Sequence, residues 1–235
     1  MTEPAEESGV SGGRVVNAAS AAATTLHLLR HGEVENAGAI LYGRLPGFHL
    51  SALGVEMAGR VAKTVADRDI THLVSSPLER AQETAAPVAA ALGLEAVIDE
   101  RVIEAANKFE GRRFGVGDGS LRKPSAWKYL YNPFVPSWGE PYKDVVVRMV
   151  AALHDAREAA SGHEALVVSH QLPIWVVRRY LEGRRLFHDP RRRHCGLASL
   201  TSITYDGERV ASIAYSEPAA DLVPAKVAKT FTAGA

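Results

Sequence analysis

Cysteine is almost absent from this sequence, with only Cys195 among 235 residues. One cysteine cannot form an intrachain disulfide, and it cannot supply a zinc cluster built from several thiolates. The sequence also lacks the His-x-His and His-Glu-x-x-His patterns that zinc sites use. We therefore expect neither a metal ion nor another cofactor.

The chain also has no excess charge of either sign. Lys+Arg and Asp+Glu are both 27, so the formal net charge is +0, and no overall field draws the protein toward nucleic acid or an anionic membrane. The basic run comprises Arg184-Arg185, Arg191-Arg192-Arg193 and His194. Without neighbouring aromatic platforms, we interpret it as a solvated loop rather than a nucleic-acid site. A rim of the substrate pocket and a contact with a partner subunit are the alternatives.

No hydrophobic run reaches the length of a membrane span, and the acidic opening lacks the basic and apolar regions of a secretory signal. We therefore expect a cytoplasmic protein with no membrane partner. A hydrophobic fraction of 46% supports a sizeable core. We predict a disordered leader over residues 1–23, one domain over residues 24–216 and a C-terminal tail over residues 217–235.

Strand and helix patterns alternate through the predicted domain. Apolar runs predict strands, and apolar residues spaced four apart, such as Met57, Val61 and Val65, predict helices. The expected strands cover residues 25–29, 71–75, 95–98 and 165–169, and the expected helices begin at residues 51, 76, 142 and 172. Asp206-Gly207 between two further strands predicts a hairpin. This order indicates an α/β fold with a mostly parallel sheet, helices on both faces and a hairpin at one edge.

The second of these helices carries a clear start signal. Ser76 is the expected N-cap, Pro77 the first helical residue and Glu79 the partner three positions after the cap. Gly93 is the expected end of the helix. Arg80 consequently falls in the first turn.

Chemically versatile residues follow three of the predicted strands. The first strand ends in Arg30-His31-Gly32-Glu33, the second leads into the helix that bears Arg80, and the fourth ends in Ser169-His170-Gln171. Ligands bind outside the carboxyl ends of the strands in open α/β sheets. If these strands are parallel neighbours, two histidines and two arginines meet in one crevice.

Such a crevice suits a phosphoryl group. Guanidinium groups bind phosphate oxygens in pairs, and a neutral imidazole can attack phosphorus to form a phosphohistidine. Gly32 would let the backbone approach the ligand closely, and a second histidine could donate to the oxygens that gain charge. The leaving oxygen also needs a proton from a carboxylic acid, for which Glu104 and Glu110 are the candidates.

Three segments of the sequence resemble the signature segments of the histidine phosphatase superfamily, which includes cofactor-dependent phosphoglycerate mutases and many small phosphatases. They are Leu29-Arg30-His31-Gly32-Glu33, the run from Ser75 to Ala85 that contains Arg80, and Val168-Ser169-His170. The resemblance spans residues 25 to 215. It implies a three-layer α/β/α fold, phosphorylation of His31 during turnover, and binding of the phosphoryl group by Arg30, Arg80 and His170. It also implies that Glu104 is the proton donor.

The sequence departs from the family pattern at three places. Asn36 follows His31 by five residues instead of the usual six, and Gln171 stands where many members have glycine. The segment from Glu104 to Gly111 is one residue shorter than the common pattern, which leaves Glu110 open as the acid. We include Asn36 and Gln171 among the expected substrate-binding residues.

Two further regions bear on the substrate. Residues 41–47 are expected to form a loop over the pocket, with Arg44 as an additional anion ligand. Aromatic side chains after residue 126 either line the substrate entrance or form a satellite core. They are Trp127, Tyr129, Tyr131, Phe134 and Trp138.

The favoured function is a phosphatase acting on a phosphorylated small molecule, with two alternatives. A phosphoglycerate mutase is the first, because Arg112-Arg113 matches an arginine pair of the mutase branch, although Lys123-Pro124 does not reproduce the proline run that accompanies it. A catalytically weak protein that binds phosphorylated ligands is the second, but Arg30, His31, Arg80 and His170 are all retained. An edge hairpin is also compatible with a homodimer.

Overall fold

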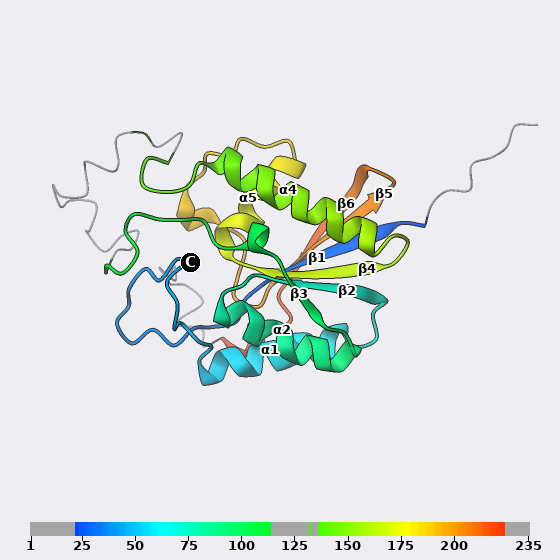
Figure 1. The fold of residues 1–235 in the computed structure, drawn as a ribbon, viewed down its shortest axis with the longest axis horizontal. Coiled ribbons are helices and arrows are strands. Elements are labelled where there is room, and N and C mark those ends of the chain that lie inside the picture. The colour runs from blue at the N-terminus through cyan, green and yellow to red at the C-terminus, as the bar shows by residue number, and fades with distance from the viewer. Residues whose placement is uncertain (1–21, 114–131, 133–135, 224–235) are drawn as a thin grey trace, which may run out of the picture.

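The computed structural model describes residues 22–113, 132 and 136–223, and within them a six-stranded sheet forms the centre (Figure 1). The strand order is β3-β2-β4-β1-β5-β6. The first four strands in this order run parallel, whereas β5 is antiparallel to β1 and β6 is antiparallel to β5. The strands are β1 (Thr24–Arg30), β2 (Ile70–Ser75), β3 (Ala96–Ile98), β4 (Glu164–Ser169), β5 (Leu200–Asp206) and β6 (Arg209–Ser216). The predicted mostly parallel sheet with an edge hairpin is confirmed.

Helices cover both faces of the sheet, which makes the three layers expected from the sequence. Figure 1 shows α1 and α2 on one face and α4 and α5 on the other. The helices are α1 (Ala52–Val65), α2 (Glu79–Leu92), α4 (Tyr142–Ala159) and α5 (Gln171–Leu181), with short 3-10 helices at η1 (Glu100–Val102), η3 (Pro190–Arg192) and η4 (Ala220–Leu222). Among the described residues, no helix is both long enough and apolar enough to pass through a bilayer.

The central strand β4 shows why the strands read as continuous apolar runs. Successive side chains of a strand point to opposite faces. Ala165 and Val167 therefore pack into the core shared with α4 and α5, whereas Leu166 and Val168 pack into the core shared with α1 and α2. Because both faces are covered, the four residues 165–168 are all apolar.

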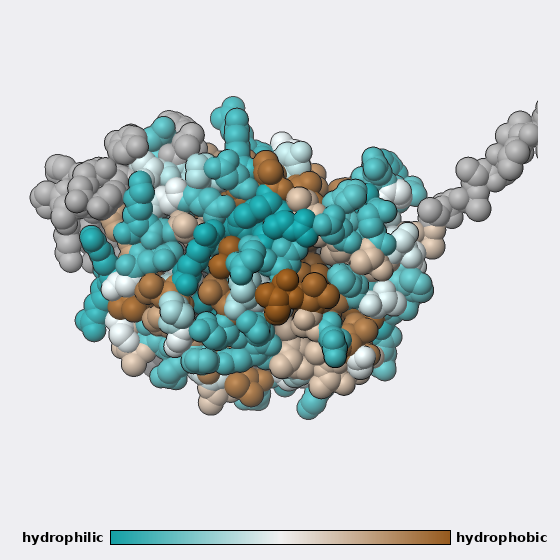
Figure 2. Space-filling view, in the orientation of Figure 1, coloured by the Kyte–Doolittle hydropathy of each residue, from teal (hydrophilic) through white to brown (hydrophobic). Residues whose placement is uncertain are grey.

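The sheet ends in two different edges. At one edge lies the short strand β3, whose Val97 and Ile98 are 51% and 47% exposed. Figure 2 shows a hydrophobic patch in this region of an otherwise mostly hydrophilic face. At the other edge, after β6, residues 217–223 of the expected tail pack back onto the core of α1 and α2, where Arg60 pairs with Asp221.

The start of α2 differs from the prediction. The helix begins at Glu79, its N-cap position is Leu78, and no side chain caps it. The hydroxyl of Ser76, predicted to be the cap, instead lies 2.7 Å from Nε2 of the buried His170. A buried imidazole nitrogen needs a hydrogen-bond partner, and Ser76 supplies it. The predicted end at Gly93 is confirmed, with Gly93 in the left-handed conformation at φ 67°.

The structure also shows a packing role for Gly32 that the sequence did not predict. A Cβ at Gly32 would lie 2.7 Å from the carbonyl oxygen of Gly54, in the first turn of α1. A Cβ at Gly54 would in turn overlap the carbonyl oxygen of Glu33. The two glycines therefore let α1 pack closely against the chain that leaves β1, and this contact is a reason for glycine at position 32 in addition to the predicted approach to a ligand.

Two glycines of α1 provide a matched test of this close packing. We expect Gly54→Ala to destabilise the protein by about 2–4 kcal/mol, because the new methyl group must displace the backbone at Glu33. Gly59→Ala, in the same helix with nothing within 4 Å of its Cβ, should stabilise it by about 0.5–1 kcal/mol. Denaturant unfolding of both variants measures the difference. Equal stabilities would contradict the packing argument.

Candidate active site

The carboxyl ends of β1, β4 and β2 bring the predicted residues to one place. Arg30 is in register with Ser169, and Ser75 with Val168. The backbone continues this pairing beyond the strands, since the N–H of His31 donates to the carbonyl of Ser169 at 3.1 Å. Residues adjacent to these strand ends therefore share one edge of the sheet.

The two histidines at this edge lie against each other. The ring centroids of His31 and His170 are 5.1 Å apart, and neither side chain is exposed. Nδ1 of His31 lies 2.8 Å from the carbonyl oxygen of Gly32. A carbonyl oxygen can only accept, so Nδ1 carries the proton and Nε2 of the neutral ring holds a free electron pair.

The surroundings of both rings favour the neutral form. Burial lowers the pKa of His31 well below its usual value, and the nearby Arg80 and Arg30 lower it further. The pKa of His170 is lowered by burial and then by Arg80 and His31. Within the described residues, Nε2 of His31 and Nδ1 of His170 have no hydrogen-bond partner. Both nitrogens remain available to a ligand.

Two buried guanidinium groups face these imidazoles. Arg30 donates from Nη1 to the carbonyl of Cys195 at 2.7 Å, and Arg80 donates from Nη2 to the carbonyl of Gly43 at 2.6 Å. In the described part of the chain, the remaining nitrogens of both groups lack a partner. Because guanidinium groups bind phosphate oxygens with several donors at once, this arrangement matches a phosphoryl dianion.

Glu104 and Glu110 differ sharply in their surroundings. Glu104 is 2% exposed, and burial raises the pKa of its carboxyl group even though the Ala105 N–H and Arg80 act in the opposite direction. Oε1 accepts from the Ala105 N–H at 2.7 Å, while Oε2 has no partner among the described residues. Glu110 is half-buried, and its Oε1 accepts from the N–H of Asn107 at 3.0 Å. Glu104 is thus the carboxyl group suited to hold a proton.

The other residues predicted to bind substrate form hydrogen bonds or ion pairs with other protein groups in this structure. The amide of Asn36 forms two hydrogen bonds with the backbone of Ile40 and so closes its own loop. Arg44 donates to the carbonyl of Glu104 at 2.6 Å and pairs with Glu140 at 2.7 Å. Arg44 therefore braces the segment that carries Glu104. Gln171 is buried, and its Oε1 accepts from Arg193 at 3.2 Å.

Two residues of the site were not predicted from the sequence. The ring of Tyr42 lies 4.7 Å from the guanidinium carbon of Arg80 and meets His31 edge-on. Thr84 accepts from the N–H of Gly32 and donates to the carbonyl of Arg80. Both residues belong to segments predicted to lie at the site. Their contacts with Arg80, His31 and Gly32 could not be predicted from the sequence.

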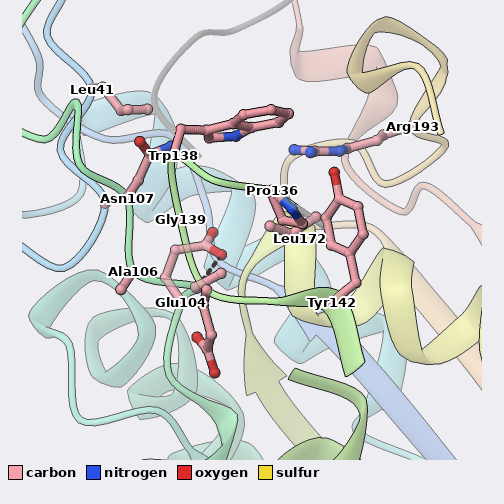
Figure 3. A pocket seen from close by; sticks show the side chains of 13 residues that line it. Leu41, Glu104, Ala106, Asn107, Pro136, Trp138, Gly139, Tyr142, Leu172 and Arg193 are labelled. Carbon is pink, nitrogen blue, oxygen red and sulfur yellow. Dashed lines mark hydrogen bonds between the residues drawn. The ribbon is translucent and has the colours of Figure 1, made fainter. Parts of the chain in front are cut away.

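A cavity of about 60 Å³ adjoins Glu104 (Figure 3). Figure 3 shows Arg193 and Tyr142 across the cavity from Glu104, with Trp138 alongside. Of the predicted aromatic residues, Trp138 lines this cavity, whereas Trp127, Tyr129, Tyr131 and Phe134 lie outside the described residues. Nowhere in residues 22–113, 132 and 136–223 do three His, Cys, Asp or Glu side chains gather as a metal ion would require.

Comparison with known proteins identifies the class that this fold and site define. The model of the histidine phosphatase superfamily (branch 1) matches residues 26–217, and the chain belongs to that family. The resemblance seen in the sequence is confirmed.

Similar proteins include an uncharacterized protein, a probable mutase and a phosphatase. An uncharacterized protein of Mycobacterium tuberculosis is 58% identical over 197 residues, which cover 84% of this chain and 98% of the relative. A probable phosphoglycerate mutase of Yersinia pestis is 32% identical, with 77% of this chain and 84% of the relative covered. The solved structure of a mycobacterial glucosyl-3-phosphoglycerate phosphatase in complex with VO3 is 27% identical, with a TM-score of 0.64 over 82% of this chain and 96% of that one.

Inorganic phosphate tests the anion site directly. We expect it to raise the melting temperature, since a ligand that binds only the folded state stabilises it by about 2.7 kcal/mol at 100 times its dissociation constant. Arg80→Gln should remove most of this shift. Arg60→Gln, which alters an exposed arginine paired with Asp221, should leave it unchanged. A full shift in the Arg80 variant would argue against this site.

Proposed function

We propose that this protein is a phosphomonoester hydrolase that works through a phosphohistidine on His31 and requires no metal ion. One observation carries the proposal. The hydrogen bond from Nδ1 of His31 to the Gly32 carbonyl leaves the electron pair on Nε2, beside the unpartnered donors of Arg30 and Arg80.

The residues can divide the reaction into two steps. Nε2 of His31 attacks phosphorus, the P–O ester bond breaks, and the leaving oxygen takes the bonding pair and a proton from Glu104. Arg30, Arg80 and His170 donate to the oxygens of the transferred group, where charge neutralisation is the main requirement of phosphoryl transfer. Water then attacks phosphorus and gives its proton to the Glu104 carboxylate. The P–N bond breaks, and its electron pair returns to His31.

A mutase remains the alternative because one relative is named a probable phosphoglycerate mutase. A mutase must return the phosphoryl group to a second hydroxyl and needs basic residues near the entrance. The Arg112-Arg113 pair that raised this possibility is exposed, and Nε of Arg113 donates to the carbonyl of Gly38. Neither residue lines the cavity beside Glu104, which favours hydrolysis. Lys123-Pro124 lies outside the described residues.

The nucleophile can be tested with p-nitrophenyl phosphate. We expect release of p-nitrophenol that persists with a chelator and is lost in His31→Ala, because the covalent step requires the imidazole. Acid quenching during turnover should trap an acid-labile phosphoryl group on residue 31. Activity that needs an added metal ion would contradict the proposal, and phosphoglycerate interconversion that depends on a bisphosphate would instead establish the mutase. If no phosphoryl transfer is detected, the result would favour the second alternative, a catalytically weak protein that binds phosphorylated ligands.

Varying the leaving group and the pH tests whether Glu104 or Glu110 is the proton donor. An alkyl phosphate needs a protonated donor, so its kcat should fall as the pH rises through the raised pKa of Glu104. Glu104→Gln should lower this kcat by about 10²- to 10⁴-fold and remove the pH dependence, with a much smaller effect on p-nitrophenyl phosphate. Glu110→Gln should change kcat by less than about threefold, because its carboxylate bonds the backbone of Asn107. The reverse pattern would make Glu110 the acid.

A further inference from the structure

Arg193 is a cation in the cavity wall whose hydrogen-bond partners among the described residues are neutral. Its Nε donates to Nε2 of His188 at 2.9 Å, and its Nη1 donates to the amide oxygen of Gln171 at 3.2 Å. No carboxylate of the described residues forms an ion pair with it. Burial, the main cause, lowers the pKa of Arg193. Arg193 is half-buried, and a cation partly removed from water is unfavourable without a counter-ion unless a ligand supplies one.

The partner His188 does not provide negative charge either. Its Nδ1 lies 2.7 Å from the carbonyl oxygen of Leu186, so Nδ1 carries the proton and Nε2 accepts from Arg193. Burial, with Arg193 as the next cause, lowers the pKa of His188 to about 4. His188 is therefore neutral near pH 7, and its role is to hold the guanidinium in place.

The neighbouring arginines are arranged differently. Arg191 pairs with Asp189 and Arg184 with Glu182, and all of these contacts lie in the surface loop. The carboxylate of Glu140, which also lines the cavity, is shared by Arg44 and Arg148. It is therefore already matched with positive charge. Arg193 therefore contributes a positive charge to this wall that no carboxylate of the described residues pairs with.

The position of Arg193 relative to Glu104 indicates which part of a substrate it meets. Figure 3 shows the two side chains on opposite sides of the cavity. If Glu104 protonates the leaving oxygen, the alcohol part of the ester lies in this cavity and extends toward Arg193. A volume of about 60 Å³ accommodates a small polar group. The planar guanidinium matches a carboxylate in both charge and geometry.

We propose that Arg193 recognises a carboxylate on the alcohol part of the substrate, so that the enzyme selects phosphate monoesters of small hydroxy acids. This inference rests on the proposed hydrolase function and adds the substrate class to it. It also assigns one residue of the basic run to the pocket, which the sequence left as an alternative.

A matched pair of esters tests the specificity. 3-Phosphoglycerate and glycerol 3-phosphate share a carbon skeleton. The first has a carboxylate where the second has a hydroxymethyl group. We expect phosphate release to show kcat/KM at least about tenfold higher for 3-phosphoglycerate. In Arg193→Gln this preference should disappear through a rise in KM of about 10- to 100-fold, as for loss of a charge-assisted hydrogen bond. Arg193→Lys should retain part of it.

The controls separate recognition from a structural role. Arg192→Gln changes an exposed neighbour in the same loop and should keep the preference. The ratio of kcat/KM for 3-phosphoglycerate to kcat/KM for p-nitrophenyl phosphate, which has no carboxylate, should fall in Arg193→Gln. Equal losses on both esters, or no preference in the unmodified enzyme, would overturn the role of Arg193 while leaving the hydrolase intact.

A binding measurement keeps the inference testable if no ester is hydrolysed. Calorimetry on His31→Ala should give tighter binding of 3-phosphoglycerate than of glycerol 3-phosphate. The double variant His31→Ala/Arg193→Gln should bind both alike. Equal affinities in the single variant would overturn the proposed carboxylate site. Failure of hydrolysis together with preferential binding would overturn only the proposed activity.

Discussion

The whole site depends on the adjacency of three parallel strands, β1, β4 and β2. Their carboxyl ends place two guanidinium groups and two imidazoles at one buried edge of the sheet. Burial and the arginines act on the histidines in the same direction, and both lower the pKa values. The imidazoles therefore remain neutral, so that a cationic pocket still presents an electron pair to an electrophile.

The residues around the site hold these groups mainly through neutral acceptors. The backbone carbonyls of Cys195, Gly43 and Gly32 accept from Arg30, Arg80 and His31. A carbonyl fixes the orientation of a guanidinium group and leaves its charge intact, whereas a carboxylate would compete with a phosphoryl dianion. Burial raises the pKa of the Cys195 thiol, so the single cysteine contributes through its backbone oxygen rather than as a reactive group.

Glu104 and the cavity wall are held in place differently from the buried arginines and histidines. Glu104 is buried, one of its carboxyl oxygens has no partner in the described part of the chain, and Arg44 fixes its backbone by donating to its carbonyl. Across the cavity, His188 and Gln171 orient Arg193 without neutralising it. Arg30, His31 and His170 lie at strand ends, whereas Arg193 lies in a loop, where the sequence can vary without disturbing the sheet.

The sequence by itself determined the strands, the hairpin and the residues of the three motifs, because apolar periodicity and the turn at Asp206-Gly207 are local signals. It left the acid open between Glu104 and Glu110, predicted the wrong helix cap at Ser76, and did not predict the close packing of Gly32 against Gly54. Only the tertiary structure shows that Glu104 is buried while Glu110 is half-buried, and that Arg193 lines the same cavity as Glu104. Burial, hydrogen-bond partners and pKa direction depend on contacts between distant segments, such as Ser76 with His170, and no local pattern encodes which of those contacts form.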